Sequence, residues 1–354
     1  MRPLRILTLE PNRNGVVSKD ATAGIERLTY ILDKELNKRG HHTTMIAREG
    51  SEITGDLIPI PEAWCSMTRE HADFEQSVLA YLNMVLNQDF YQYDLILDHM
   101  TEIMLYAKNL PIPVVTVLHM PPVYYWDERY FGKPDRSNNH YVAITRTQKQ
   151  LYEEKRIFIN EVIYNGIDIE NFPFTSEKEE YLLFIGRFVE EKGPHIAIET
   201  ARRTGKKIIL AGGPDTCLSS KDYFSHITGQ ADGVHIIYAG QIGLSRKLPL
   251  MQKALAVLMP SNSANGFQES APLVCMESLA CGTPVIALNN GSLPELIEHG
   301  KTGFICDSAD QLAAAVRKIH EINPLLCRRA AEEKYSGSVM ARAYDSYFRR
   351  ILYT

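Results

Sequence analysis

Two glutamates, Glu269 and Glu277, are eight residues apart in the sequence. The second lies inside a helix that the sequence predicts from Ala271 or Pro272 to Ala280. Eight residues of α-helix span roughly 12 Å, more than the roughly 5–9.5 Å that separates the carboxylates of a hydrolytic pair. We therefore expect the two acids to contact different parts of one long ligand. The alternative is that both are solvated charges at the ends of the helix, since most glutamates are exposed.

The start of the same helix offers a second kind of chemistry, because free backbone amides at a helix N-terminus bind phosphate. Pro272 has no amide hydrogen, so such a site would depend on its neighbours. We expect the ligand to contact the residues on either side of this proline, which are Ser270, Ala271, Leu273 and Val274.

Two basic residues, Arg187 and Lys192, follow the first predicted strand of the second half of the chain. In parallel α/β sheets, ligands bind in the crevice outside the carboxyl ends of the strands. A guanidinium and an ammonium group at this spacing can hold the oxygens of a diphosphate from two directions. The alternative is a surface arginine and a lysine at the entry of a helix.

His119 ends another predicted strand, and an aromatic-rich stretch follows it directly. The position favours a histidine that contacts a ligand, although a lone histidine is more often a structural group. Aromatic rings can stack on a sugar face or a planar aglycone, or can fold the loop onto the core. The aromatic residues in question are Tyr124, Tyr125, Trp126 and Tyr130.

The elements that would position these residues are short Val/Ile/Leu-rich runs alternating with helical patterns. Continuous apolar runs are typical of parallel strands that are buried on both faces. The expected strands are Leu4–Leu9, Thr43–Ala47, Leu95–Leu97, Val114–Leu118, Tyr141–Ile144, Val162–Tyr164, Leu182–Ile185, Lys207–Leu210, Val234–Tyr238, Ala256–Met259 and Val285–Leu288. Amphipathic helices are expected over residues 25–36 and from Pro194 onward, so the pattern predicts an α/β protein with open parallel sheets.

The length of 354 residues predicts two domains, and the charged run around Asn171–Glu180 indicates the linker. We expect an N-terminal Rossmann-like domain over residues 1–170 and a C-terminal one over residues 171–335. Residues 336–354 are expected to form a C-terminal helix that could pack back on the N-terminal domain. Two such domains would face each other across a central cleft that holds the ligand.

Composition narrows the classes of function. The net charge is −5, and residues 1–172 hold 18 basic and 24 acidic side chains, a net of −6, which disfavours nucleic acid or anionic lipid as a partner. No apolar run approaches the roughly 20 residues of a membrane-spanning helix, and the N-terminus lacks a signal-peptide pattern. The six cysteines include no Cys-x-x-Cys pair, so we expect reduced thiols in a cytoplasmic protein without a zinc site.

The Glu-x7-Glu spacing, followed by Ala280-Cys-Gly-Thr-Pro-Val-Ile286, resembles retaining glycosyltransferases of family 4, which have the GT-B fold. Six further matches occur in family order along nearly the whole chain. They are Ala23-Gly-Ile-Glu-Arg27, Lys38-Arg-Gly-His41, Thr116-Val-Leu-His119, Tyr164-Asn-Gly-Ile-Asp168, Gly186-Arg-Phe-Val-Glu-Glu-Lys-Gly193 and Glu298-His-Gly-Lys-Thr-Gly303. The chain departs from the family at three positions: Ala271 replaces an aromatic residue, Pro272 removes an amide and Ala23 replaces a glycine.

The resemblance implies a role for each candidate residue. Arg187 and Lys192 would stabilise the diphosphate leaving group, and His119 would contact the sugar near the reacting carbon or orient the acceptor. Glu277 would accept hydrogen bonds from the ribose, and Glu269 from hydroxyls of the donor sugar. The glycines that would allow close approach to the nucleotide sugar are Gly24, Gly186, Gly212 and Gly213.

The expected function is metal-independent transfer of a hexosyl group from a nucleoside-diphosphate sugar, such as UDP-glucose, to a hydroxyl of a soluble acceptor, with retention at the anomeric carbon. No Asp-x-Asp occurs, so a metal bridging the diphosphate has no support in the sequence. An epimerase or phosphorylase on the same fold and a non-catalytic nucleotide-sugar-binding module remain alternatives. A P-loop hydrolase is disfavoured, because Glu295 occupies the position of the required glycine before Gly300-Lys301-Thr302.

Overall fold

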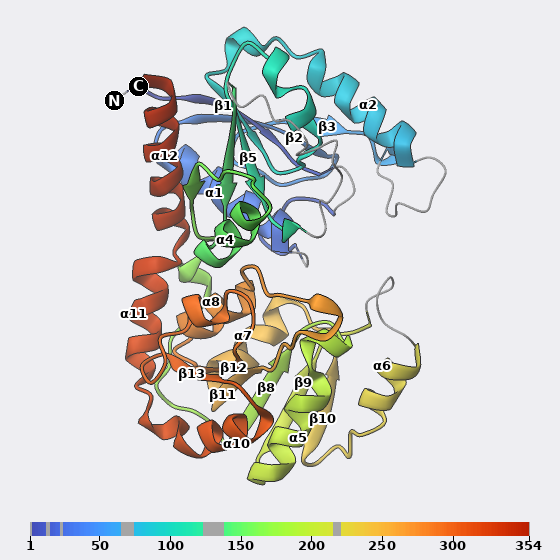
Figure 1. Cartoon of the computed structure of the whole chain (residues 1–354), viewed down its shortest axis with the longest axis vertical. Coiled ribbons are helices and arrows are strands. Elements are labelled where there is room, and N and C mark those ends of the chain that lie inside the picture. Colours follow the sequence, from blue (N-terminus) through green and yellow to red (C-terminus); the bar gives the residue numbers. More distant parts are fainter. Residues whose placement is uncertain are drawn as a thin grey trace. The chain divides into compact units, whose positions relative to one another are not determined.

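The computed structural model describes residues 2–11, 15–21, 24–64, 74–122, 138–214 and 221–353. The chain divides into two compact units (Figure 1). Unit 1 consists of Met1–Gly166 together with Gly337–Thr354, and unit 2 of Ile167–Ser336. The four aromatic residues that follow His119 in the sequence prediction, and Ala23 of the N-terminal motif, lie outside the described residues.

Unit 1 contains a seven-stranded parallel sheet in the order β3-β2-β1-β4-β5-β6-β7. The strands are β1 (Arg5–Leu9), β2 (His42–Arg48), β3 (Asp56–Ile60), β4 (Leu95–Asp98), β5 (Val114–Leu118), β6 (Asn139–Ala143) and β7 (Glu161–Val162). The strand order reverses at β1, which pairs with β2 on one side and β4 on the other. Ligands in open α/β sheets bind outside the carboxyl ends of the strands at such a reversal.

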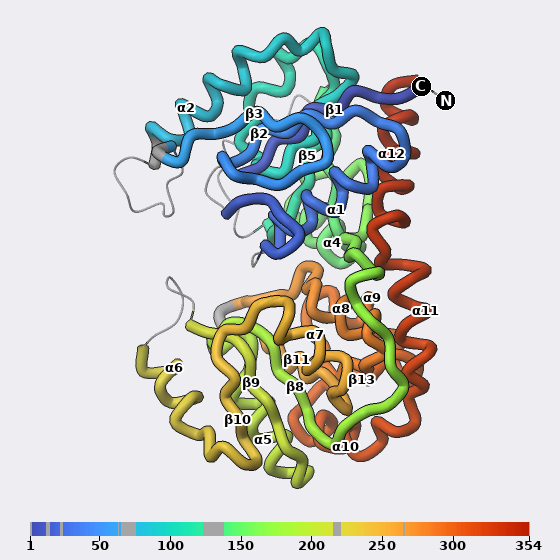
Figure 2. The backbone as a smooth tube through the Cα atoms, turned by 180° about the vertical axis from the view of Figure 1, so that it is seen from behind, coloured from blue at the N-terminus to red at the C-terminus, as the bar shows by residue number. Residues whose placement is uncertain are grey.

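The α-helices described for unit 1 include one that comes from the end of the chain. They are α1 (Gly24–Lys38), α2 (Phe74–Leu86), α4 (Arg146–Glu154) and α12 (Gly337–Tyr353). The last of these, α12, packs against α1, and both views place the two helices close together (Figures 1 and 2). Asp345 of α12 contacts Arg39 at 3.4 Å and His41 at 3.2 Å, next to the carboxyl end of α1.

Unit 2 contains a six-stranded parallel sheet in the order β10-β9-β8-β11-β12-β13. Its strands are β8 (Tyr181–Ile185), β9 (Lys207–Ala211), β10 (Ile236–Gly240), β11 (Ala256–Met259), β12 (Val285–Leu288) and β13 (Gly303–Cys306). Its α-helices among the described residues are α5 (Pro194–Thr204), α6 (Lys221–Thr228), α7 (Leu244–Lys253), α8 (Leu273–Ala280), α9 (Leu293–Leu296), α10 (Ala309–Lys318) and α11 (Pro324–Lys334). The strand order reverses at β8, between β9 and β11.

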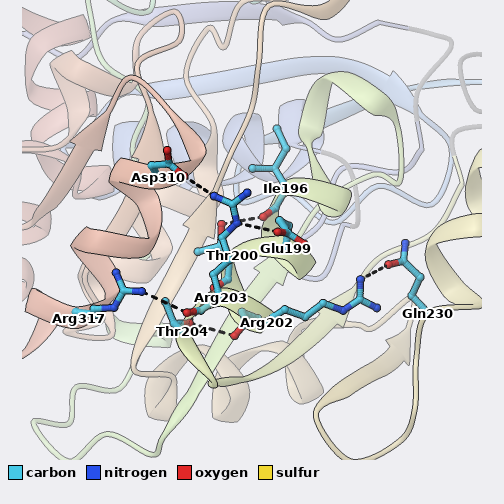
Figure 3. A network of polar contacts seen from close by, with 10 residues as sticks. Ile196, Glu199, Thr200, Arg202, Arg203, Thr204, Gln230, Asp310 and Arg317 are labelled. Atoms are coloured by element: carbon cyan, nitrogen blue, oxygen red, sulfur yellow. Dashed lines mark hydrogen bonds and ion pairs between the residues drawn. The ribbon is translucent and has the colours of Figure 1, made fainter.

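An exposed polar network joins α5 to its surroundings (Figure 3). Arg203 lies between Glu199, one helical turn earlier, and Asp310 of α10. Arg317 of α10 donates to the backbone oxygen of Arg203 at 3.3 Å. These contacts accompany the packing of α5 against α10. Helix α10 in turn packs against β12 and β13.

The two parallel sheets confirm the predicted fold class, and each predicted strand overlaps an observed one. The strand predicted at Val234–Tyr238 is shifted to Ile236–Gly240, and α8 begins at Leu273 rather than at Ala271 or Pro272. Two strands, β3 and β13, were not predicted. Both are edge strands, and the sequence of β3 contains Pro59, a residue that sheets tolerate at an edge but that disfavours a central strand.

Candidate active site

Most candidate residues of unit 2 lie on the segments that follow β8, β9 and β11, next to the strand reversal, and the others lie in α8. Gly212 has a φ of +143° after β9, and a Cβ on it would lie 1.9 Å from the backbone oxygen of Gly186 after β8. The amide of Phe188 donates to the oxygen of Gly213 at 2.8 Å. Glycine at position 212 therefore allows the loops that follow β8 and β9 to pack directly against each other.

Arg187 and Lys192 stand in different surroundings. Arg187 is exposed directly after β8. Lys192 ends a short 3-10 helix, Glu190–Lys192, and is followed by Gly193 with a φ of +69°. A Cβ on Gly193 would lie 2.3 Å from the backbone oxygen of Pro260, so this turn requires glycine. The turn holds Lys192 beside the segment that follows β11.

Glu269 is nearly buried, with 5% of its surface exposed, and two side chains converge on its Oε1 atom. Lys192 Nζ lies 2.6 Å from this oxygen, and Ser261 Oγ donates to it at 2.6 Å. Lys192 Nζ also lies 4.7 Å from the centroid of the Phe267 ring, a distance that permits a cation–π contact. The structure thus brings together two of the predicted residues, Lys192 and Glu269, and adds Ser261.

The backbone of Glu269 is fixed by a turn from the loop after β12. Its amide donates to Asn290 Oδ1 at 2.9 Å, and its carbonyl accepts from the amide of Ser292 at 2.8 Å. Between them, Gly291 has a φ of +54°, and a Cβ there would lie 2.2 Å from the Glu269 oxygen. Any side chain at Gly291 would push this turn away from Glu269.

Glu277 lies inside α8 and is fully buried. Its Oε2 atom is 2.7 Å from Lys247 Nζ of α7, and the Lys247 side chain is only 10% exposed. A buried carboxylate needs such a partner to remain charged. The sequence prediction missed Lys247, because the helix that carries it shows no motif and the two partners are 30 residues apart.

The N-terminus of α8 has no side-chain cap. Pro272 is its N-cap and supplies no side-chain cap, and the flanking residues Ser270, Ala271, Leu273 and Val274 are all half-buried. The first amides of an α-helix have no partner within the helix. Together with the helix dipole, they favour an anion at this end.

In unit 1, Gly24 begins α1 and is exposed, whereas His119 directly follows β5 and is 6% exposed. His119 Nε2 lies 2.9 Å from Nδ1 of His99, which follows β4. The two rings stack with their centroids 5.1 Å apart and their planes at 21°. Burial lowers the pKa of His119 to about 4 and that of His99 well below its usual value. Both imidazoles are therefore neutral at physiological pH, with one proton in the bond between them.

Further buried acids surround the carboxyl ends of β1 and β4, and the sequence prediction gave them no role. Asp98 ends β4 and accepts hydrogen bonds from the amides of Met100 and Thr101 and from Thr116 Oγ1, and burial raises its pKa to about 7. Glu10 directly follows β1 and is 1% exposed. A polar residue at the carboxyl end of the first strand is the signal that could have found Glu10.

Neither a metal-binding cluster nor a membrane-spanning helix is found among the described residues. Among the described residues, no group of three or more His, Cys, Asp or Glu side chains could hold a metal ion. No described helix is both long enough and apolar enough to cross a membrane.

A surface hollow of about 570 Å³ in unit 1 is lined by Arg2, Arg349, Arg350 and Tyr353. Each arginine there already has a carboxylate partner, which disfavours an anion; the partners are Asp94, Asp345 and Glu161 respectively.

Comparison with known families places a match on each half of the chain. A family described as Glycosyl transferases group 1 matches residues 167–336, and one described as Glycosyltransferase Family 4 matches residues 22–171. The chain is 32% identical over 185 residues to a glycogen synthase of Mycobacterium tuberculosis, which is 48% of this chain and 42% of that protein. It is 32% identical over 142 residues to a D-inositol 3-phosphate glycosyltransferase of Acidothermus cellulolyticus, which is 36% of this chain and 30% of that protein. The matched region thus spans less than half the length of either relative.

Solved structures match over the whole chain at lower identity. AviGT4, a glycosyltransferase involved in avilamycin A biosynthesis, has a TM-score of 0.73 and 22% identity, with 99% of this chain and 98% of that chain covered. Anabaena Alr3699/HepE in complex with UDP-glucose has a TM-score of 0.72 and 17% identity, with 98% and 100% covered. At these identities the likeness shows the fold, which is GT-B with two Rossmann-like units.

Proposed function

Because the chain belongs to glycosyltransferase family 4, we propose that it transfers a hexosyl group from a nucleoside-diphosphate sugar to a hydroxyl of an acceptor. Unit 2 would bind the donor, for which UDP-glucose is the first candidate, and unit 1 would bind a soluble acceptor. The observation that carries the proposal is the convergence of Lys192 and Ser261 on the nearly buried Glu269, next to the carboxyl ends of β8 and β11.

Lys192 is suited to link two groups of the donor. An ammonium group has three N–H bonds that can donate hydrogen bonds, and one of them is engaged by Glu269 Oε1 at 2.6 Å. The remaining donors can bind diphosphate oxygens while Glu269 accepts hydrogen bonds from the sugar. Arg187, exposed after β8, adds a second positive charge for the leaving group. Gly186, Gly212 and Gly213 keep side chains away from the same edge.

Glu277 is proposed to accept hydrogen bonds from the ribose. The ion pair with Lys247 supplies a counter-charge for its carboxylate and fixes its orientation. Because Glu277 is fully buried, ribose binding requires local movement of the side chains that cover it. The half-buried N-terminus of α8 would bind a phosphate oxygen through backbone amides of Leu273 and Val274.

Two parts of the proposal concern the course of the reaction. Positive side chains rather than a metal would stabilise the leaving diphosphate, so turnover is expected to persist in the presence of a chelator. We also propose retention at the anomeric carbon, as the resemblance to the family implies, and NMR of the product checks it. In unit 1, the neutral His119 would orient the acceptor hydroxyl, with its tautomer set by the bond to His99.

The direct test is release of UDP from UDP-glucose with and without added acceptors. We expect Arg187→Ala and Lys192→Ala each to reduce turnover by roughly 10²–10³-fold, the usual effect of removing a charge-stabilising donor. Arg202→Ala is the matched control, because Arg202 is an exposed arginine of the same unit on α5. Full turnover in either site variant would contradict the assignment of the leaving-group residues.

The same assay separates the alternatives. A transferase releases UDP only when an acceptor hydroxyl is present. An epimerase changes the sugar without an acceptor and without net release of UDP, and a phosphorylase transfers the sugar only when inorganic phosphate is present. A non-catalytic binding module would show a rise in melting temperature with UDP-glucose, by mass action, but no release of UDP with any acceptor.

A further inference from the structure

The strand reversal of unit 1 carries polar residues that the proposed donor site does not use. Leu9 at the end of β1 is in register with Asp98 at the end of β4, and the amide of His99 donates to the oxygen of Leu9 at 3.0 Å. Glu10 and His99 are therefore neighbours one residue beyond the paired strands. Their backbones thus lie side by side beyond the carboxyl ends of β1 and β4.

The Glu10 carboxyl is buried without a partner. Neither of its oxygens has a hydrogen-bond donor among the described residues, although only 1% of the residue is exposed. Glu26 of α1 is the acid whose charge acts on it, and burial together with this charge raises the pKa of Glu10 well above its usual value. Thr29 of α1 offsets this rise in the pKa of Glu10 only in part, because its hydroxyl also donates toward the carbonyls of Ile25 and Glu26, 3.1 Å away.

Of the two carboxyl oxygens of Glu26, one has a hydrogen-bond partner among the described residues. Its Oε1 atom accepts from the amide of Gly15 at 2.8 Å, but its Oε2 atom is buried without a partner in the part of the chain that the structure describes. Buried carboxyls without hydrogen-bond partners destabilise the folded state and are rare in folded proteins. Two of them that interact with each other indicate a position where a ligand supplies the missing donors and the missing positive charge.

His99, whose backbone lies next to that of Glu10, provides an independent observation. Its Nδ1 atom is bonded to His119, whereas its Nε2 atom is buried and has no partner among the described residues. The unpartnered atoms of the three residues can all act as acceptors, which favours a ligand rich in donors.

We propose that Glu10, Glu26 and His99 bind the acceptor, and that the acceptor is an amino sugar or aminocyclitol whose protonated amine lies between the two carboxylates. The inference rests on the proposed function and names the acceptor class for unit 1. A primary ammonium group consists only of donors and carries the charge that the two acids lack. A hydroxyl of the same ring reaches His99 Nε2. The net charge of −6 over residues 1–172 favours a cationic acceptor and disfavours a phosphorylated one.

The same contact connects acceptor binding to His119. When His99 Nε2 accepts from the acceptor, the proton of this neutral imidazole is on Nδ1 and is donated to His119 Nε2. The remaining proton of His119 is then on its Nδ1 atom. His99 is thus a positioning residue, which sets the tautomer of His119 only when the acceptor is bound.

The test measures binding of D-glucosamine, 2-deoxystreptamine, D-glucose and N-acetyl-D-glucosamine to the full chain by saturation-transfer NMR, with no nucleotide sugar present. We expect the two amines to bind, and N-acetylation to weaken binding by about tenfold or more, the loss typical of a charged hydrogen bond. Glu10→Gln, which keeps the shape and removes the charge, should have the same effect. Glu49→Gln is the matched control, because Glu49 is an exposed acid of the same unit.

Equal binding of the amines and their neutral counterparts, or unchanged amine binding by Glu10→Gln, would overturn the proposal. A thermal-shift measurement with UDP-glucose on the same samples tests the donor site separately. Loss of the UDP-glucose shift with intact amine binding would contradict the proposed function and not the acceptor site. For His99→Gln, we expect a changed pH profile of amine binding, which a purely structural role would not produce.

Discussion

The buried acids of the two units differ in one respect. In unit 2, Glu269 and Glu277 each have a lysine partner, at 2.6 and 2.7 Å. In unit 1, the buried oxygens of Glu10 have no partner among the described residues, and neither has Oε2 of Glu26. Glu10 directly follows β1, and Glu269 contacts Lys192 of the loop after β8, so each unit has a buried acid beside its strand reversal and the topology alone does not explain the difference.

The difference indicates two ways of preparing a site for a ligand. Carboxylates that are paired with a lysine are already oriented before the ligand arrives, which suits the recognition of neutral hydroxyls. Unpartnered carboxyls are destabilising until a ligand brings the counter-charge, which suits recognition of a cation. Mutations that remove a charge should therefore have opposite effects on the stability of the two units.

The largest effect on stability is expected at Lys247. Lys247→Met leaves the fully buried Glu277 without its cation, and we expect a loss of about 3–5 kcal/mol in the free energy of unfolding. Denaturant unfolding measures the change. The double variant Lys247→Met with Glu277→Gln should recover most of the loss, because it leaves no unpaired charge. Equal instability in the single and double variants would mean that packing rather than charge explains the effect.

The next effect concerns the histidine pair of unit 1. The pKa of His119 is about 4 in the folded chain and about 6.5 when unfolded, so the unfolded state binds more protons between these values. The contribution of His119 to the free energy of unfolding is lost as the pH falls from about 6.5 toward 4, by roughly 3 kcal/mol in total. Asp98, with a pKa raised to about 7, acts in the opposite direction over the same range.

The measurement is therefore the difference in unfolding free energy between wild type and His119→Gln, followed from pH 7.5 to pH 4.5. The variant should gain relative to wild type as the pH falls, because it no longer carries the buried imidazole. A difference that stays constant with pH would show that His119 is not held neutral by burial.

A smaller effect of opposite sign to that at Lys247 is expected at Glu10. Glu10→Gln removes a buried carboxyl that has no partner among the described residues, and we expect the chain to gain about 1 kcal/mol in stability, as is common when a strained functional group is removed. The sign has a pH test. Because burial raises the pKa of Glu10, its native state becomes less favourable as the pH rises above the unfolded value, so the gain should increase with pH.

Glu153→Gln is a suitable control for this gain, since Glu153 is an exposed acid on α4 of the same unit. Destabilisation by Glu10→Gln without added ligand would mean that the carboxyl has a partner in the folded chain. That result would remove the contrast between the units.

The sequence predicted the elements better than it predicted these partners. Buried parallel strands are continuous apolar runs, so β5 and β11 could be located from composition alone. The edge strands β3 and β13 carry a weaker signal, because β3 contains a proline and β13 is four residues long and begins with glycine. Edge strands need fewer hydrogen bonds and less burial, which loosens the constraint on their sequence.

The residues of the candidate site also differ in how far the sequence predicts them. Arg187, Lys192 and Glu269 could be proposed from spacing and family resemblance, because each lies in a local motif. Lys247 and Ser261 could not, because they acquire meaning only through contacts with residues brought close by folding. A pair such as Lys247 and Glu277 depends on the packing of two helices, and no property of either sequence segment predicts it.

The smallest effect is expected in the exposed network of unit 2. Arg203 pairs with Glu199 and Asp310, but its side chain is 42% exposed and those of its partners are 47% and 87% exposed (Figure 3). Exposed ion pairs contribute little, because water and salt screen the charges and the side chains lose entropy when they are held in place. We expect Arg203→Ala to leave the melting temperature and the turnover unchanged within error, at low and at high salt. A clear, salt-dependent loss of stability would show that the charge of an exposed pair matters as much as that of the buried Lys247–Glu277 pair, and burial would then not be what separates strong from weak ion pairs in this protein.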